Sequence, residues 1–183
     1  EERRAKAVEL IDFDRDMARL FSAKPKAGGD GADPEKFQRY FAMHGRYTAG
    51  VETRYDASLI TGDSTHQQLA SGLVIGKRFH SAPVIRLADA KPVQLGHTIK
   101  ADGRWRLFAF ACQGDPTDAR SSLAQLCDFL GRAPESPMLR YTSAGLDIDS
   151  AIDLRAVLQQ GHRALDLRAM HPFLKPNKGR HGL

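Results

Sequence analysis

The sequence has little cysteine, no long apolar run and no initiating methionine. Its 183 residues include two cysteines, Cys112 and Cys127. Two thiols are too few for a disulfide framework and are typical of a reducing compartment, so we expect a cytoplasmic location. No stretch reaches the roughly 18 apolar residues of a membrane-spanning helix, and the Glu-Glu-Arg-Arg start is unlike a secretory signal. Without a starting methionine, the chain is expected to begin inside a longer protein.

The positive charge of the chain lacks the pattern of a nucleic-acid binder. The net charge is +5, yet residues 1–60 hold 11 basic and 11 acidic residues, and residues 61–161 hold 11 and 10. The remaining surplus lies in the tail from His162 to Leu183, where Phe173 is the only aromatic residue. Binders of nucleic acid show basic stripes interleaved with stacking aromatics. We therefore expect no nucleic-acid partner, and the 42% apolar content predicts a packed core.

The common patterns of catalytic and metal-binding residues are also missing. None of the seven histidines stands at metal-ligand spacing from a Glu or a second His, and no G-x-S-x-G motif occurs. His97 alternates with apolar residues, which favours a buried, hydrogen-bonded histidine over a ligand. Carboxylates gather at Asp147/Asp149 and at Asp12, Asp14 and Asp16. Surface charge explains both groups better than acid–base chemistry, so no catalytic, cofactor-binding or metal residue is predicted.

The first half of the chain predicts helices joined by loops. Apolar residues recur at helical spacing from about Glu2 to Phe21, and Pro25 prevents continuation. The Gly-rich residues 26–32 lack the Lys-Ser/Thr of a phosphate-binding loop and indicate a flexible connection. Asp33-Pro34 is a helix start, and we expect that helix to end at Gly45. Residues 46–75 predict an extended segment with few apolar runs.

Strand patterns begin near Val84. Residues 93–99 alternate between apolar and polar, which predicts a half-buried strand, and Asp102-Gly103 fits the turn of a hairpin. The returning strand would run from Trp105 to Cys112. Its apolar run from Leu107 to Ala111 is typical of a central strand that is covered on both faces.

An α/β layer is therefore expected from about residue 83 onward. Leu123, Leu126, Cys127 and Leu130 share one face of a helix that Gly131 closes, so Cys127 is expected to be a core thiol. Residues 152–157 alternate like a strand, although a helix is also compatible, and a short helix is expected at 165–170. The strand-to-helix junction at Cys112 has no second cysteine at C-x-x-C spacing. A thioredoxin-like fold would therefore lack its redox chemistry here.

Several segments, in order along the whole chain, match a known family pattern. They are Glu1-Glu2-Arg3-Arg4, Leu10-Ile11-Asp12-Phe13-Asp14, Ala18-Arg19-Leu20-Phe21-Ser22, Gly45-Arg46-Tyr47-Thr48-Ala49-Gly50, Tyr55-Asp56-Ala57-Ser58-Leu59-Ile60, Gly76-Lys77-Arg78-Phe79-His80-Ser81-Ala82-Pro83-Val84, Leu87-Ala88-Asp89-Ala90-Lys91-Pro92, Asp102-Gly103-Arg104-Trp105-Arg106 and Lys178-Gly179-Arg180-His181-Gly182-Leu183. Together they resemble the carboxy-terminal part of flavin-dependent aromatic hydroxylases of the phenol 2-monooxygenase and 3-hydroxybenzoate 4-monooxygenase group.

This resemblance implies three parts. Residues 1–25 would be the terminal helix of the FAD domain, residues 26–82 a linker, and residues 83–183 a thioredoxin-like domain without a redox dithiol. The intact enzyme would be a homodimer that hydroxylates a phenolic ring of the 3-hydroxybenzoate or phenol type, using FAD, NADPH and O2. The chain has neither the G-x-G-x-x-G motif nor the later Gly-Asp segment of such enzymes, so no catalytic or cofactor residue is carried over.

Two hypotheses about the chain compete. The first is a structural, dimer-forming end of such a hydroxylase, and the alternative is a free-standing, non-catalytic thioredoxin-like interaction module. A free module would not normally start with an uncapped charged helix and a 50-residue connection, which favours the first. We also expect self-association through the region from about residue 83 onward, because strands with open edges must be covered, charged or paired.

Overall fold

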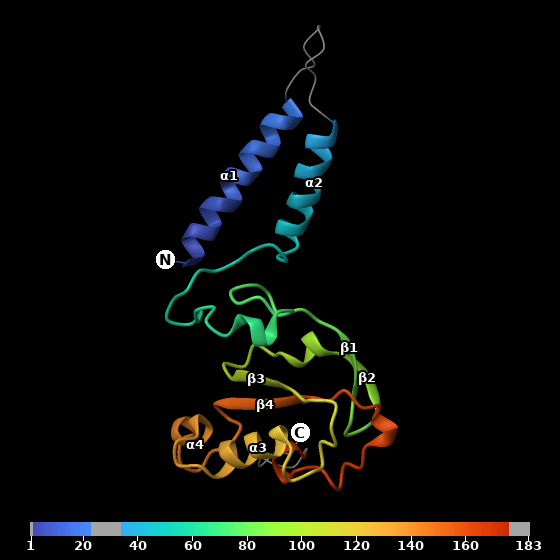
Figure 1. The fold of residues 1–183 in the computed structure, drawn as a ribbon. Coiled ribbons are helices and arrows are strands. Elements are labelled where there is room, and N and C mark those ends of the chain that lie inside the picture. Colours follow the sequence, from blue (N-terminus) through green and yellow to red (C-terminus); the bar gives the residue numbers. More distant parts are fainter. Residues whose placement is uncertain (1, 23–33, 176–183) are drawn as a thin grey trace. The chain divides into compact units, whose positions relative to one another are not determined.

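The structure, a computed structural model, describes residues 2–22 and 34–175. The chain divides into two compact units, one up to His80 and one from Ser81 (Figure 1). The flexible Gly-rich connection expected at 26–32 falls outside the described residues, as does the end of the basic tail, residues 176–183.

The first unit begins with two α-helices. The helix α1 spans Glu2–Ser22, as predicted, and α2 spans Pro34–Thr48. The two helices pack through aromatic rings: Phe13 of α1 stacks on Tyr40, His44 and Tyr47 of α2, with centroid distances of 5.1, 4.7 and 5.3 Å. These ring contacts hold the helix pair together with very little buried aliphatic surface.

The second helix ends later than predicted. We expected it to end at Gly45, but it continues to Thr48. The extra turn carries Tyr47, whose ring stacks on α1 and whose hydroxyl donates to the carbonyl of Lys6 at 3.3 Å. Gly50, with φ of +72°, follows the last turn. A glycine inside a helix costs about 1 kcal/mol, and the contacts of Tyr47 offset that cost.

The prediction of an extended segment at residues 46–75 is wrong. Residues 46–48 belong to α2, and residues 49–80 are folded locally. They form turns and a short 3-10 helix, Gln67–Ala70, and an isolated antiparallel bridge joins Arg54 to Lys77. We call residues 54–77 the bridged loop. The prediction failed because polar side chains within this segment bond its own backbone and fold it locally.

Up to residue 175, the second unit contains two small sheets and two α-helices. Its elements are β1 (Pro83–Arg86), β2 (Lys91–Gln94), β3 (Trp105–Phe110), α3 (Ser122–Arg132), α4 (Pro137–Tyr141) and β4 (Ile152–Val157). β1 pairs with β2 antiparallel, while β3 pairs with β4 in parallel, with Trp105 opposite Ile152. The α/β class is thus confirmed, as are the helix after Cys112 and the strand at 152–157.

The predicted hairpin around Asp102-Gly103 is wrong. The expected strand at 93–99 stops at Gln94, because Leu95 is buried and its N–H donates to the carbonyl of Ala82 at 2.8 Å, which turns the chain into a 3-10 helix. Gly103 does adopt a positive φ of 77°, but the strand after it pairs with β4 instead. A local turn signal therefore did not identify the strand partner.

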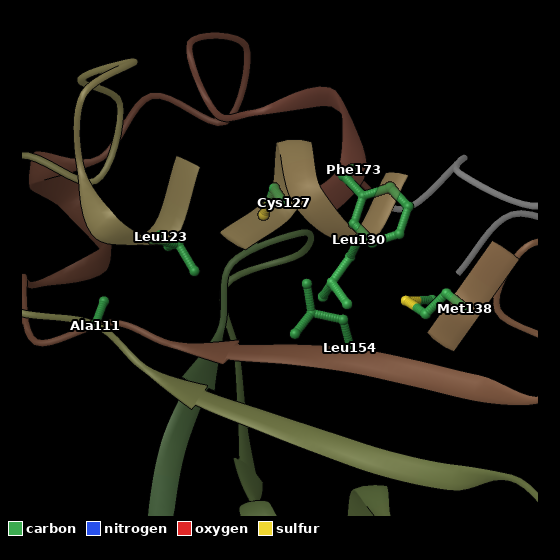
Figure 2. Packing of buried hydrophobic residues seen from close by; sticks show 7 residues of the cluster. All are labelled: Ala111, Leu123, Cys127, Leu130, Met138, Leu154 and Phe173. Carbon is green, nitrogen blue, oxygen red and sulfur yellow. The ribbon is translucent and has the colours of Figure 1, made fainter. Parts of the chain in front are cut away.

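The core lies between α3 and one face of the β3–β4 sheet. Its buried members are Ala111, Leu123, Cys127, Leu130, Met138, Leu154 and Phe173. Figure 2 shows Leu130 of α3 above Leu154 of β4, with Met138 and Phe173 closing one end. Cys127 is fully buried, as predicted for a core thiol. This is a helix crossover that joins two parallel strands and covers one of their faces.

Two further predictions about this unit are wrong. β3 is not a central strand covered on both faces, because β4 is its only strand neighbour among residues 2–22 and 34–175, and Trp105, Leu107 and Phe110 are exposed. No α-helix forms at 165–170. The chain there makes turns between two short 3-10 helices, His162–Ala164 and Pro172–Leu174.

Candidate functional site

A crevice lies where β3 ends and α3 begins, the place where a strand–helix redox site would be. Its volume is about 440 Å³. The lining comes from the end of β3, the connecting loop and the first two turns of α3, and includes Cys112, Asp115, Pro116, Arg120, Ser121 and Leu126. Cys112 is exposed, whereas Cys127 lies in the core, and both thiols are free. The crevice therefore presents one accessible thiol, that of Cys112.

The polar groups of this crevice are bonded to one another. Asp115 accepts hydrogen bonds from the N–H and the hydroxyl of Thr117 at 2.8 and 2.7 Å, and these bonds lower the pKa of the Asp115 carboxyl. Ser121 caps α3 by accepting from the N–H of Ala124 at 3.1 Å. Since these donors and acceptors already have partners, the crevice stabilises the start of α3 and offers no nucleophile–base pair.

A second cluster, of charged side chains, lies on the sheet face opposite α3. Ala109 of β3 and Ala111 just after it face the core, so the alternating Arg106 points to the other face, and Asp153 lies opposite it in β4. Asp153 accepts from Nε of Arg155 at 2.8 Å, and Nε of Arg106 lies 3.4 Å from the same carboxylate. The side chains of Arg106 and Asp153 are only 5% and 4% exposed.

The turn before β3 completes this cluster. Asp102 accepts from Nη2 of Arg106 at 2.5 Å and from Nη2 of Arg104 at 2.8 Å. The hydrogen bond from Arg106 and, to a smaller extent, that from Arg104 hold the pKa of the Asp102 carboxyl far below its usual range. The cluster thus ties the 102–104 turn to both strands, and three arginines compensate two carboxylates. It acts as a structural ion-pair network rather than as an acid–base pair.

The residues singled out from the sequence fall in different places. Asp12, Asp14 and Asp16 are exposed on α1, as predicted, and two of them pair with arginines one turn later. His97 is exposed at the end of a 3-10 helix, so the prediction of a buried strand histidine is wrong. Asp149 is buried rather than at the surface, which corrects the expectation for the Asp147/Asp149 pair.

Sequence reasoning missed the Arg106–Asp153 network. The usable signal was one arginine in the otherwise apolar β3 and one aspartate in β4, but only the parallel register places those two residues opposite each other. Within the described part of the chain, no three His, Cys, Asp or Glu side chains gather in a way that could hold a metal ion. None of the helices described is both long enough and apolar enough to cross a bilayer.

A family model described as the phenol hydroxylase C-terminal dimerisation domain matches residues 53–183. The chain belongs to this family. It is 53% identical over its whole length to a 3-hydroxybenzoate 4-monooxygenase of Comamonas testosteroni. It is 34% identical, over 86% of its length, to the FAD-dependent monooxygenase terD of Aspergillus terreus, and 30% identical, over 96%, to the phenol 2-monooxygenase fsqG of Aspergillus fumigatus. The family resemblance expected from the sequence is thus confirmed.

The chain spans between 26% and 29% of the length of these relatives. Its described residues do not fit a flavin dinucleotide. The only crossover from a parallel strand to a helix described here, β3 to α3, opens with Asp115 and Asp118, which repel a pyrophosphate, and Ser121 already caps the helix. No step of flavin chemistry can therefore be assigned to these residues.

Proposed function

We propose that this chain is the carboxy-terminal, dimer-forming part of an FAD-dependent aromatic monooxygenase. The intact enzyme would hydroxylate a phenolic substrate of the 3-hydroxybenzoate or phenol type with NADPH and O2, in the cytoplasm. The observation that carries this proposal is the 53% identity to a 3-hydroxybenzoate 4-monooxygenase over all 183 residues. The two free thiols agree with a reducing compartment.

Within that enzyme, we assign a structural role to this part. Residues 83–183 would form a thioredoxin-like domain without a redox dithiol, supported by the parallel β3–β4 pair, the covering helix α3 and the lone accessible Cys112. Residues 26–82 would be the linker. The enzyme would be a homodimer, in line with the family to which the chain belongs.

Residues 1–25 would be the terminal helix of the FAD domain. Two observations support this assignment. The dimerisation model starts at residue 53, whereas the 3-hydroxybenzoate 4-monooxygenase matches from residue 1. Moreover, Met17 is the only buried apolar residue of the first unit among those described, and a helix pair with so small a core needs further surface to stabilise it.

The test compares the full-length enzyme with the 183-residue chain. We expect the full-length protein to retain FAD after desalting and to oxidise NADPH with formation of a hydroxylated product from 3-hydroxybenzoate or phenol. We expect the 183-residue chain to retain no FAD. Full-length protein that neither binds FAD nor forms product would reject the monooxygenase assignment and would favour the alternative, a free-standing interaction module.

A further inference from the structure

The bridged loop is closed at its base. The bridge between Arg54 and Lys77 is followed by a hydrogen bond from the N–H of Tyr55 to the carbonyl of Gly76 at 2.9 Å. Gly76 has a φ of +81°, and a Cβ atom there would lie 2.1 Å from the carbonyl oxygen of Tyr55. Only glycine permits this closure, because other residues would be strained in φ and would clash with the backbone.

Side chains also hold the loop from inside. The amide of Gln67 donates to the carbonyls of Ala70 and Leu73 at 2.9 and 3.1 Å, and its oxygen accepts from the N–H of Ile75 at 2.8 Å. At the tip, the hydroxyl of Ser58 accepts from the N–H of Thr61 at 3.2 Å. The loop is therefore shaped by its own hydrogen bonds.

This internally bonded loop presents apolar side chains to solvent. Leu59, Leu69 and Ile60 are 105%, 81% and 71% exposed, the three highest values among the large apolar side chains of the described residues. From Ala57 to Gly76 the sequence has one charged residue, Asp63, although 27% of the whole chain is charged. Exposed apolar groups and a shortage of charge are the compositional marks of an interface core.

We propose that the exposed apolar side chains of the bridged loop, Leu59 and Ile60 near Ser58 and Leu69 in the 3-10 helix, lie in the interface between two copies of the enzyme. The matched dimerisation region begins at residue 53, immediately before the base of the loop, so the loop belongs to the part of the chain that is matched to dimerisation. Because residues 57–76 carry only the charge of Asp63, two identical surfaces can meet across a two-fold axis with little repulsion. The inference rests on the proposed homodimer and assigns part of its surface.

The test uses the full-length enzyme with the double substitution Leu59→Asp/Ile60→Asp. The matched control is Leu146→Asp, which changes an exposed leucine in a turn of the second unit. We expect the double variant to raise the dimer dissociation constant at least about hundredfold in sedimentation velocity, with flavin content and thermal unfolding unchanged, since interface anchors carry effects of this size. The control should stay within about threefold of the parent enzyme.

Each other outcome has a defined meaning. A double variant that dimerises like the parent, an equal loss in the control, or loss of flavin from a variant that stays dimeric would each overturn the inference. If the double variant does not fold, amide hydrogen exchange of residues 57–65 is measured in the unmodified enzyme instead. The inference expects these amides to exchange at least tenfold faster after dilution to monomer, and an unchanged rate would overturn it. A parent enzyme that is monomeric at all concentrations would instead reject the proposed homodimer itself.

Discussion

The two units of the chain differ in how their apolar residues are used. In the unit from Ser81, apolar side chains of β3, α3, α4 and β4 form one buried cluster. In the unit up to His80, Met17 is the only buried apolar residue among those described, while Val8, Ile11, Leu59 and Ile60 are exposed. The comparison separates two sources of structure. Helical pattern and local hydrogen bonds shape the first unit, whereas burial stabilises the second.

The largest effect should come from Leu130→Ala in the 183-residue chain. Leu130 is almost fully buried in the cluster of the second unit, so its truncation should lower the free energy of unfolding by about 3–5 kcal/mol, including the cavity that it leaves. Chemical denaturation measures this change, with the fluorescence of Trp105, which lies in the same unit, as the signal. Met17→Ala is the matched variant in the first unit, and it should leave the Trp105 transition within about 0.5 kcal/mol of the parent. A common shift would show that the two units unfold as one.

The next effect concerns the buried charges. Asp153→Ala should destabilise the second unit by about 3 kcal/mol, because the buried Arg106 would lose one of its two partner carboxylates and keep only Asp102. Asp12→Ala removes an exposed ion pair with Arg15 on α1 and should change stability by less than about 0.5 kcal/mol. Urea titrations of both variants make the comparison. Similar losses in the free energy of unfolding would mean that burial does not strengthen the ion pairs of the Arg106 cluster.

A smaller effect is expected from the caps. Ser136→Ala removes a buried hydroxyl that donates to the carbonyl of Leu130 at 2.6 Å and accepts from the N–H of Leu139, so a loss of about 1–2 kcal/mol is expected. Ser58→Ala removes an exposed turn hydroxyl from the bridged loop and should cost less than about 0.5 kcal/mol. Thermal unfolding of the two serine variants measures the difference, and a larger loss at Ser58 would contradict it.

The smallest effect is a pH dependence at the surface. Hydrogen bonds from Arg86 lower the pKa of Asp89, beside β1, to about 2. Because the folded value lies below the unfolded one, the stabilisation is present above about pH 4 and is lost as the pH falls through about 2. A carboxyl titration by NMR should show a midpoint near 2, which Arg86→Ala should return toward 3.8. In the first unit, Lys77 and Arg46 lower the pKa of Glu52, which should respond in the same direction. An unchanged midpoint in the Arg86 variant would assign the shift to another cause.

Local patterns predicted the helices α1 and α3 well and the strand partners poorly. The apolar spacing of α1 and α3 was sufficient, because each helix satisfies its backbone within one segment. The partner of β3 lies beyond α3 and α4, and no turn signal near Gly103 contains that information. The short helix α4 was predictable in principle, since Ser136-Pro137 has the same cap pattern that identified the start of α2.

The candidate sites followed the same division. Cys127 could be placed in the core from helical spacing alone. The burial of Asp149 and the exposure of His97 depend on how distant segments of the chain pack. The local sequence pattern around each residue therefore does not predict its burial. For the same reason, the Arg106–Asp153 network becomes visible only when the parallel register is known.

The parallel pairing of β3 with β4 also sets an order of events during synthesis and folding. In the β1–β2 hairpin, Arg86 pairs with Lys91, so this ribbon can close as soon as its few residues exist. β3 can pair with β4 only after α3 and α4 have been synthesised, because the partner of Trp105 is Ile152. Contacts between segments so distant in sequence form slowly, since closing a long loop has an entropic cost that is met before any contact forms. Until then the apolar run of β3 stays uncovered, which makes this strand the part of the nascent chain most in need of protection from aggregation.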